Sequence, residues 1–581
     1  MADVRTATAD LFEEKPELEG DLEAVLAVDA EHETWEFADI PLDSGTFGEL
    51  VSRGIVEKVE GEYALADPDA VTAALHGDES LAEDGTESEG SSRPFNVSTS
   101  VRGVVDSVRV DRRVAIVLLG ALSLVVLFRV LPYPSVFRGG DVVLSGNDPY
   151  FYRYHVHQLL AESTDPLDFS VLSSLPSQMA HGEPLMVAAL WFASALLGGA
   201  SAVGGVLAWY PVLSAVVTAL LVSVLTVRVT EDRRAGFAAV ALLAIIPAHA
   251  FRTGLGFADH HAFDYPWLAL TALAVVSLAR DGRPERKANS EWKFRDGRTW
   301  AWALVLGVGV GGQTLAWDAG PLLLVPLALY ALAVVPSWLR ADRSPLIEGW
   351  PLVVGTGVGA LLVVWAHVSF GWHTQAVVAA PALLVGGMVG VLALGEGARR
   401  VGASVRSVVG AEIGGLIVGV VVLWAAFPPF VAELDRGIDF LVSTGGIAET
   451  MSLVSGDLGT LVGPIFLFGF ALFLAVPYLA WASWRAYRSL APRCLLASVY
   501  GWYFLVLALI QIRFAGQLAL FAAVFGGLGF VHVAAWVDLA AYPAPFGADE
   551  SGTSPISPDG RRARSSENDP PELEWPERRE A

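Results

Sequence analysis

The sequence predicts an all-α polytopic membrane protein that carries a small α+β domain at its N-terminus. Of the 581 residues, 53 % are hydrophobic, which is more than soluble domains carry. The apolar residues come in blocks of about 20, the length that an α-helix needs to cross about 30 Å of hydrocarbon. The first block begins near Val114, after a polar and acidic stretch. We therefore expect no cleavable signal peptide.

The charge of the chain narrows the function classes. The formal net charge is −24 at pH 7, and only four of the 38 basic residues are lysines. Acidic residues with arginine in place of lysine are typical of a salt-loving organism. An acidic balance argues against nucleic acid as a partner. The single cysteine, Cys494, excludes a disulfide within the chain.

Residues 1–77 are predicted to form an acidic, winged-helix-like cytosolic module. Residues 21–28 and 43–51 read as helices, and residues 55–59 and 63–65 read as a hairpin. Few basic residues oppose its many carboxylates, so we expect the module to bind an accessory protein, not DNA. The acidic, serine-rich residues 78–112 are typical of a disordered linker.

Twelve apolar blocks within residues 113–537 read as transmembrane helices, with boundaries uncertain by about 2–4 residues. They lie at 113–133, 206–228, 236–251, 266–280, 299–316, 319–338, 349–369, 376–395, 408–428, 461–483, 495–512 and 514–537. A further apolar stretch, 184–198, is predicted to be a surface or re-entrant helix. If it crossed the membrane, the alternation of arginine-rich loops would break at Arg233.

Arginine placement predicts the orientation of the spans. The arginine-rich loops alternate with loops that carry few arginines. We therefore expect both termini to be cytoplasmic and the long loops 134–205, 252–265 and 429–460 to face outside. The tail, residues 538–581, is rich in proline and charge and is predicted to be disordered and cytoplasmic.

Acidic residues and histidines gather in the predicted outer loops. Asp148 follows a turn sequence just outside the first span, where it binds a metal or simply caps the turn. Asp259 and His261 stand two apart in the loop before residue 266, and an extended backbone would point both side chains the same way. A carboxylate with an imidazole suits Mn²⁺, and also Mg²⁺ or Zn²⁺. Asp264 nearby reads as a surface charge.

Two further charged residues lie at the same predicted face. Glu449 follows Gly445-Gly446 in the 429–460 loop, and glycines make such a loop mobile. Arg513 stands at the outer end of a span, where it either binds phosphate through its planar guanidinium or extends to the membrane surface.

Taken together, these motifs resemble the catalytic subunit of oligosaccharyltransferases, especially the archaeal members. Asn147-Asp148-Pro149-Tyr150 matches the first acidic motif, and Asp259-His260-His261 matches the second in its Asp-x-His form. Gly446-Ile447-Ala448-Glu449 resembles the Thr/Ser-x-x-Glu motif, with Gly446 in place of the hydroxyl residue. Arg513-Phe514 resembles the arginine that contacts the lipid pyrophosphate. The resemblance covers nearly all of residues 113–537 and implies a GT-C-like fold.

The resemblance also implies an activity. A glycan would leave its dolichyl, or other polyprenyl, phosphate or pyrophosphate carrier at the outer face of the cell membrane and join an Asn of an acceptor polypeptide. Asp148, Asp259 and His261 would bind Mn²⁺ or Mg²⁺. Asp148 and Glu449 would hold the acceptor amide, and Arg513 would neutralise the leaving phosphate.

Two residues are further candidates, and one family feature is absent. Arg252 opens the second cluster, and Asp318 lies in Trp317-Asp318-Ala319-Gly320, which also reads as an aromatic corner of the membrane interface. The family's external domain carries a Trp-Trp-Asp-x-Gly motif that reads the acceptor, and this sequence has none. We therefore keep two alternatives: a GT-C glycosyltransferase with a lipid, polysaccharide or other acceptor, and a non-catalytic paralogue that regulates a transferase.

Overall fold

A computed structural model describes most of the chain. It covers single positions between residues 4 and 43, then residues 44–59, 62–68 and 71, and then residues 112–279, 297–442, 448–454 and 459–547. The chain divides into two compact units, Met1–Arg109 and Val110–Ala581. The predicted linker up to residue 111 and the tail from residue 548 lie outside the described residues.

The N-terminal unit contains the predicted helix and hairpin. Helix α3 (Ser44–Ser52) is followed by strands β1 (Val56–Val59) and β2 (Glu62–Leu65), which pair antiparallel. The described positions between residues 22 and 29 are helical, as expected. The Asp29 carboxylate accepts hydrogen bonds from the Trp35 indole and from the Leu65 backbone, both at 2.8 Å. Asp29 thereby joins the end of that helix to the hairpin.

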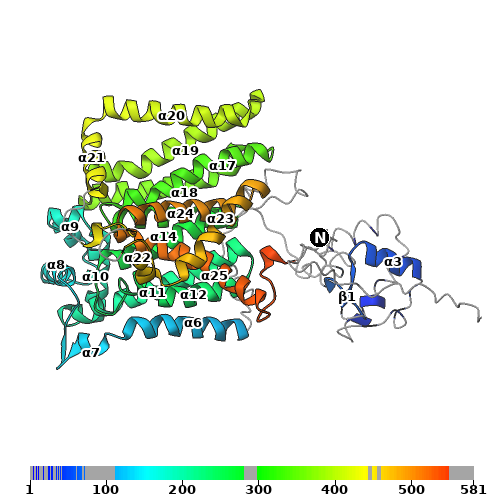
Figure 1. Cartoon of the computed structure of the whole chain (residues 1–581), viewed down its shortest axis with the longest axis horizontal. Coiled ribbons are helices and arrows are strands. Elements are labelled where there is room, and N and C mark those ends of the chain that lie inside the picture. Colours follow the sequence, from blue (N-terminus) through cyan, green and yellow to red (C-terminus); the bar gives the residue numbers. More distant parts are fainter. Residues whose placement is uncertain are drawn as a thin grey trace, which may run out of the picture. The chain divides into compact units, whose positions relative to one another are not determined.

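The second unit is a helical bundle (Figure 1). Its helices are α6 (Arg112–Val130), α7 (Tyr133–Val136), α8 (Asp148–Glu162), α9 (Ser177–His181), α10 (Pro184–Leu197), α11 (Val203–Thr230), α12 (Arg233–Ile245), α13 (Pro247–Ala250), α14 (His260–Leu278), α16 (Gly297–Ala316), α17 (Gly320–Arg340), α18 (Pro345–Phe370), α19 (Gln375–Val401), α20 (Val405–Ala426), α21 (Pro428–Val442), α22 (Gly459–Phe468), α23 (Ala471–Ser489), α24 (Pro492–Ile510) and α25 (Ala515–Trp536). Strands β3 (Phe137–Arg138) and β4 (Asp141–Val142) form a short antiparallel pair. The 3₁₀ helices are η4 (Phe169–Ser174), η5 (Gly199–Ser201), η7 (Ala448–Thr450), η8 (Ile512–Phe514) and η9 (Ala544–Phe546).

The structure confirms the predicted all-α membrane architecture. Within the described residues, nine helices are long and apolar enough to cross a membrane, and ten if the pair α22 and α23, bent by 93°, is one span. These coincide with ten of the twelve predicted spans. Helix α10 has 14 residues, or about 21 Å, which is too short to cross. That length agrees with its prediction as a surface or re-entrant helix.

The other two predicted spans are also helices in the structure, but each fails one requirement for crossing a membrane, either the length or the hydropathy. Helix α12 has only 13 residues, about 20 Å, and ends before Pro247. Helix α16 has 20 residues but is rich in glycine. Its Gly307 packs so closely on α18 that a Cβ there would lie 2.6 Å from Val358. Small residues let two membrane helices approach in this way, so α16 belongs to the bundle through packing.

Burial identifies the centre of the bundle. In α25, 78 % of the apolar window is buried, against 11 % in α6 and in α20. Figure 1 shows α14, α24 and α25 in the middle, α6, α11 and α12 on one side, and α17 to α20 on the other. In α20 only Val408 and Glu412 are buried, so this helix presents most of its apolar surface outward.

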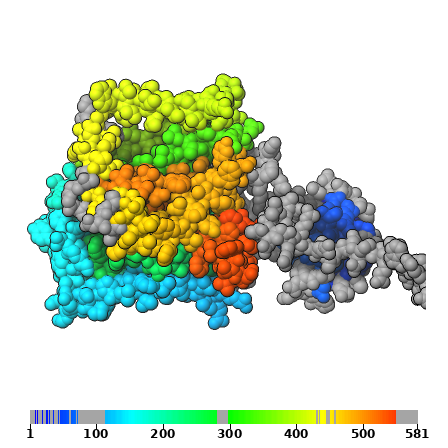
Figure 2. Space-filling view, viewed as in Figure 1, coloured from blue at the N-terminus to red at the C-terminus, as the bar shows by residue number. Residues whose placement is uncertain are grey.

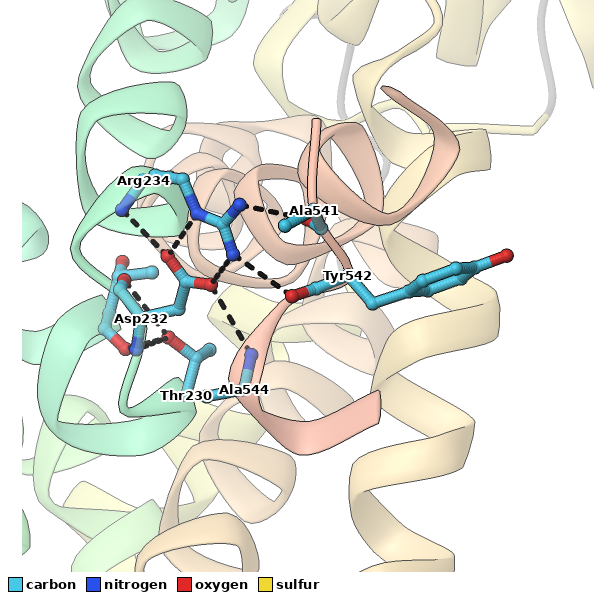
Figure 3. A network of polar contacts seen from close by, with 7 residues as sticks. Thr230, Asp232, Arg234, Ala541, Tyr542 and Ala544 are labelled. Atoms are coloured by element: carbon cyan, nitrogen blue, oxygen red, sulfur yellow. Dashed lines mark hydrogen bonds and ion pairs between the residues drawn. The ribbon is translucent and has the colours of Figure 1, made fainter. Parts of the chain in front are cut away.

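The C-terminal segment after α25 lies against the bundle (Figure 3). Arg234 donates to the backbone oxygens of Ala541 at 2.8 Å and Tyr542 at 3.0 Å. The carboxylate of Asp232 holds Arg234 at 2.7 Å and accepts a hydrogen bond from the Ala544 backbone at 3.3 Å. Residues 538–547 were assigned by sequence to the disordered tail, but here they are anchored to the α11–α12 turn.

An aromatic cluster fixes the end of this segment. Phe546 stacks on His532 of α25 with ring centroids 4.2 Å apart, and it also contacts Trp481 of α23 at 4.6 Å. Figure 2 shows the segment, in red, against the orange surface of α23. Two prolines in the segment suggested an irregular tail, and the contact with Trp481 comes from a different helix, α23.

Candidate active site

The second acidic motif lies where a loop enters α14. Asp259 precedes the helix with an extended backbone (φ −138°, ψ 149°), and its side chain makes no capping hydrogen bond. Its backbone oxygen instead accepts a hydrogen bond of 2.6 Å from the hydroxyl of Tyr210, on α11. The backbone is thereby fixed while the carboxylate remains available to other groups.

A glycine turn ties this loop to the first motif. Gly256 has a φ of +82°, and a Cβ there would lie 2.7 Å from Val136. Its backbone nitrogen donates to Ala208 of α11, and its oxygen accepts from Ser145, both at 2.9 Å. Because Ser145 lies three residues before Asp148, this contact brings the two acidic motifs to the same end of the bundle.

Asp259, His260 and His261 form a group of metal-capable ligands. One ligand atom from each residue lies within 4.8 Å of the others. The Nδ1 atoms of His260 and His261 lie 2.8 Å and 3.3 Å from the Asp259 carboxylate. The prediction that a shared extended backbone aligns Asp259 and His261 is wrong, because both histidines already belong to α14. The helical turn brings in His260 as well.

Arg252 sits at the centre of the charges. Its Nη1 atom lies 3.0 Å from Asp259 Oδ2 and 3.4 Å from His261 Nδ1. Its Nη2 atom donates to Glu449 Oε1 at 2.6 Å. Burial alone would lower the pKa of Arg252, but the surrounding groups, Tyr265 and Glu449 first, raise it. The guanidinium therefore stays charged and joins the second and third predicted motifs.

Asp148 lies beside this group but outside it. It is exposed at the start of α8, and its carboxylate makes no hydrogen bond to the described part of the chain. It does not cap the turn, since the N-cap position is Asn147 and no side-chain capping bond forms there. Partial burial and the negative charge of Asp259 raise its pKa. The carboxylate is close enough to sense Asp259 and Glu449 and is accessible to a ligand.

The loop segment with Glu449 is docked on the turn between α24 and α25. The backbone nitrogen of Ile512 donates to Met451 at 2.7 Å, and that of Leu453 donates to Ala508 at 3.1 Å. Glu449 itself lies in η7. Gly445, Gly446 and Ile447, which the motif includes, lie outside the described residues.

Arg513, on this turn, lies beside a group of aromatic rings. Its guanidinium carbon lies 4.2 Å from the ring centroid of Phe440, on α21. Trp317 contacts Phe440 and Phe514 with centroids 6.3 Å and 6.5 Å apart, and it stacks on His260 at 5.0 Å. Arg513 is electrostatically coupled to Glu449 and Arg252. A charged phosphate brought here would meet two arginines.

Sequence reasoning missed Glu183 and misjudged Asp264. Burial raises the pKa of Glu183 to about 7, with Asp318, Asp259 and Asp148 acting in the same direction. Glu183 therefore belongs to the acidic group, and so does the exposed Asp318. The available signal was an acid directly before the apolar stretch 184–198. Asp264, expected at the surface, is fully buried in α14.

The donor set fits a divalent cation. His260 Nε2 and His261 Nε2 are buried and make no hydrogen bond to the described chain, and Asp259 Oδ1 lies 2.8 Å from His260 Nδ1. A carboxylate oxygen with imidazole nitrogens suits Mn²⁺ or Zn²⁺ and admits Mg²⁺. Asp148 is exposed and makes no hydrogen bond to the described residues, so it is free to add a further oxygen ligand.

Part of this chain is similar in sequence to known proteins. Residues 118–396 match the family model of oligosaccharyl transferase STT3, N-terminal. Over 245 residues the chain is 29 % identical to dolichyl-phosphooligosaccharide-protein glycotransferase 3 of Archaeoglobus fulgidus, covering 40 % of this chain and 27 % of that relative.

Solved structures share the fold. The Archaeoglobus fulgidus oligosaccharyltransferase AglB, in complex with an inhibitory peptide and a dolichol-phosphate, superposes with a TM-score of 0.62 at 22 % identity, over 74 % of this chain and 51 % of that one. The Archaeoglobus fulgidus enzyme with Zn and sulfate gives a TM-score of 0.54 at 20 % identity, over 72 % and 49 %. The form tethered with an acceptor peptide containing the NVT sequon gives 0.57 at 19 %, over 75 % and 52 %.

The chain spans about half the length of these solved relatives. Its apolar helices and this fold make it a multi-pass membrane protein. Residues 118–396, a little under half of the chain, are therefore similar to the oligosaccharyltransferase STT3 family.

Proposed function

We propose that this protein transfers a glycan from a polyprenyl (dolichyl) phosphate or pyrophosphate carrier to an asparagine of an acceptor polypeptide. The observation that carries the proposal is the Arg252 cluster. It gathers Asp259 from the second motif and Glu449 from the third at one end of a membrane bundle, with Arg513 and Asp148 beside them.

Each residue then has a role that its chemistry supports. The acceptor amide nitrogen bonds to the anomeric carbon, and the bond from that carbon to phosphate oxygen breaks with its electron pair leaving on the phosphate. Asp148 and Glu449, as carboxylates, accept the amide N–H groups, and one of them takes the proton. Arg513 binds the released phosphate through its guanidinium. Arg252 holds Glu449 in register with Asp259.

A divalent cation, Mn²⁺ or Mg²⁺, fits the group Asp259, His260 and His261, with Asp148 as a further oxygen donor. When bound, such a cation stabilises negative charge on the leaving phosphate. The relative solved with Zn and sulfate belongs to the same fold. The histidines orient the carboxylate by their short contacts of 2.8 Å and 3.3 Å.

We also propose that the cluster faces outside and that both chain ends are cytoplasmic, as the arginine pattern predicts. Helix α6 begins and α25 ends at the bundle end opposite the cluster (Figure 1). A reporter fused after residue 581 should therefore score cytoplasmic, and an external score would contradict this orientation. The acidic N-terminal unit would then meet cytosolic partners.

The deciding experiment is glycan transfer by the purified full chain in lipid. A dolichyl-linked glycan extract and an Asn-x-Ser/Thr peptide are supplied with Mn²⁺ or with chelator. We expect metal-dependent glycopeptide from the wild type, none from Asp148→Asn, and wild-type yield from Asp141→Asn, an exposed carboxylate in the same loop. Glycan consumption without glycopeptide would reject the peptide as acceptor, and full activity of Asp148→Asn would reject the site.

A further inference from the structure

Three arginines stack on aromatic rings at the end of the bundle opposite the candidate site. The guanidinium carbon of Arg340, the last residue of α17, lies 4.6 Å from the ring centroid of Tyr487. In the last turns of α23, Arg488 lies 4.6 Å from the Trp484 ring, and Arg485 lies 5.4 Å from the Trp481 ring. We call these six residues the arginine–aromatic patch.

The patch lies far from the Asp259 cluster. Helix α17 starts at Gly320, three residues after Trp317, and runs 21 residues to Arg340, which is about 31 Å. Helix α24 runs 19 residues from Pro492, next to the end of α23, to the turn that carries Arg513, about 28 Å. The patch therefore lies at the other membrane surface (Figure 1).

Among the described residues, no carboxylate neutralises the patch. Within the described residues none of its three arginines forms an ion pair, and the one hydrogen bond made by their guanidinium groups runs from Arg340 to the backbone oxygen of Tyr487 at 2.9 Å. Two other arginines at this end do form ion pairs with a carboxylate. Arg399 and Arg400 lie 2.7 Å and 3.1 Å from Glu396. In a chain with a net charge of −24, three unpaired arginines on one surface mark a preference for an anion.

The rings around the arginines indicate where that anion comes from. Trp484 and Tyr487 are 56 % and 65 % exposed, although both are large aromatic side chains at the end of a membrane helix. Tryptophan and tyrosine at such positions lie at the headgroup level of the bilayer. A planar guanidinium donates to two phosphate oxygens at once. The patch thus offers aromatic anchoring at the lipid interface together with phosphate donors.

From this geometry we propose that the arginine–aromatic patch binds the phosphate headgroup of an anionic membrane lipid in the leaflet opposite the candidate active site. The glycerol and upper chains of the lipid pack against Trp484 and Tyr487, while Arg340, Arg485 and Arg488 surround the phosphate. This lipid is separate from the glycan carrier, and the inference does not depend on the proposed function.

The test measures lipid retention by the full-length protein. The protein is equilibrated with vesicles of phosphatidylcholine and phosphatidylglycerol, extracted with its bound lipid, and analysed by native mass spectrometry. Each arginine near a charged surface contributes about fivefold to affinity. We expect Arg488→Gln to weaken phosphatidylglycerol retention about fivefold and the triple change of Arg340, Arg485 and Arg488 to Gln to weaken it about a hundredfold.

Arg400→Gln is the matched control, since Arg400 is exposed at the same surface and Glu396 keeps Arg399 as a partner. It should retain wild-type lipid binding. Trp484→Leu, which preserves every arginine, should weaken retention about twofold to fivefold. It remains informative if the triple variant fails to fold, which a thermal unfolding curve would reveal.

Three outcomes would overturn the inference. Equal retention by the wild type and Arg488→Gln would show that the patch binds no lipid. Equal losses in Arg488→Gln and Arg400→Gln would show that only the summed surface charge matters. Displacement of phosphatidylglycerol by inorganic phosphate at the same concentration would assign the patch to a free anion.

Discussion

The Arg252 guanidinium donates to Glu449 across 2.6 Å and thereby joins two loops that lie 197 positions apart in the chain. The same guanidinium contacts Asp259 at 3.0 Å. One partly buried cation thus fixes the spacing between the carboxylate of the second motif and that of the third. In the proposed reaction, Arg252 therefore holds Glu449, which accepts the amide N–H of the acceptor, beside Asp259 of the proposed cation site.

Replacing Arg252 should impair transfer more than it impairs folding. Arg252→Gln removes both ion pairs, and a hydrogen bond to a charged group contributes about 1.5–3 kcal/mol. We expect kcat/KM for the peptide to fall at least about tenfold. A double-mutant cycle with Glu449→Gln should give strongly non-additive losses, because each change breaks the same contact.

The matched control for that cycle is Arg138→Gln, an exposed arginine of β3 in the same predicted outer region. Paired with Glu449→Gln, it should give additive losses. Additive losses for Arg252 and Glu449 as well would show that the contact of 2.6 Å does not contribute to transfer.

The histidines of the cluster should control metal affinity. His261→Ala removes a buried imidazole from the group of three ligands, and loss of one ligand should weaken Mn²⁺ binding at least about tenfold. Titration followed by electron paramagnetic resonance measures this directly, without any glycan. His157→Ala, on α8 and outside the group, should bind Mn²⁺ as the wild type does. Unchanged affinity in His261→Ala would remove His261 from the ligand set.

Local sequence patterns were sufficient for much of this fold. Runs of apolar residues predicted ten spans that the structure contains, because length and hydropathy depend only on the residues of each helix. They were less informative for α16, whose place in the bundle rests on the approach of Gly307 to α18. Such packing depends on a partner that periodicity does not reveal.

The motifs of the candidate site could be recognised in the sequence, but the contacts between them could not. Asp259 and His261 stood out as an acid and an imidazole in one loop, but the central position of Arg252 depends on Glu449, from a distant segment. Glu183 was not identified from the sequence, because a single acidic residue before an apolar stretch does not form a recognisable motif. Residues 538–547 read as disordered because Arg234, which anchors them, lies about 300 positions away along the chain.

Gly256, in the loop before Asp259, should contribute to the stability of the protein. Gly256→Ala introduces a Cβ 2.7 Å from Val136 at a φ of +82°, and such strain costs about 1–3 kcal/mol. We expect a lower midpoint of thermal unfolding in detergent. Gly254→Ala, two positions earlier, places its Cβ 3.6 Å from its nearest neighbours and should leave the midpoint unchanged. Equal midpoints for both variants would contradict the close approach.

The C-terminal segment should detach when its anchor is removed. Arg234→Gln loses the hydrogen bonds to the backbone of Ala541 and Tyr542. Amide exchange measured by mass spectrometry should become faster for residues 541–547, while α25 remains protected. Arg233→Gln changes the neighbouring exposed arginine and should leave exchange as in the wild type. Unaltered exchange in Arg234→Gln would mean that the aromatic contacts of Phe546 suffice.

Arg129 should be the most sensitive charged residue of the first span. It is fully buried in α6, and its guanidinium donates to the backbone oxygens of Leu243 and Ala244, where α12 ends, and to the Thr253 hydroxyl. A buried charge in a membrane helix persists only when it is satisfied in this way. Arg129→Met would leave these acceptors unpaired at about 1–3 kcal/mol each. We therefore expect little folded protein in size-exclusion chromatography of a fluorescent fusion, whereas Arg112→Met, exposed at the start of the same helix, should elute normally. A normal elution profile for Arg129→Met, with unchanged transfer, would mean that the end of α12 and the loop before Asp259 hold their positions without this side chain.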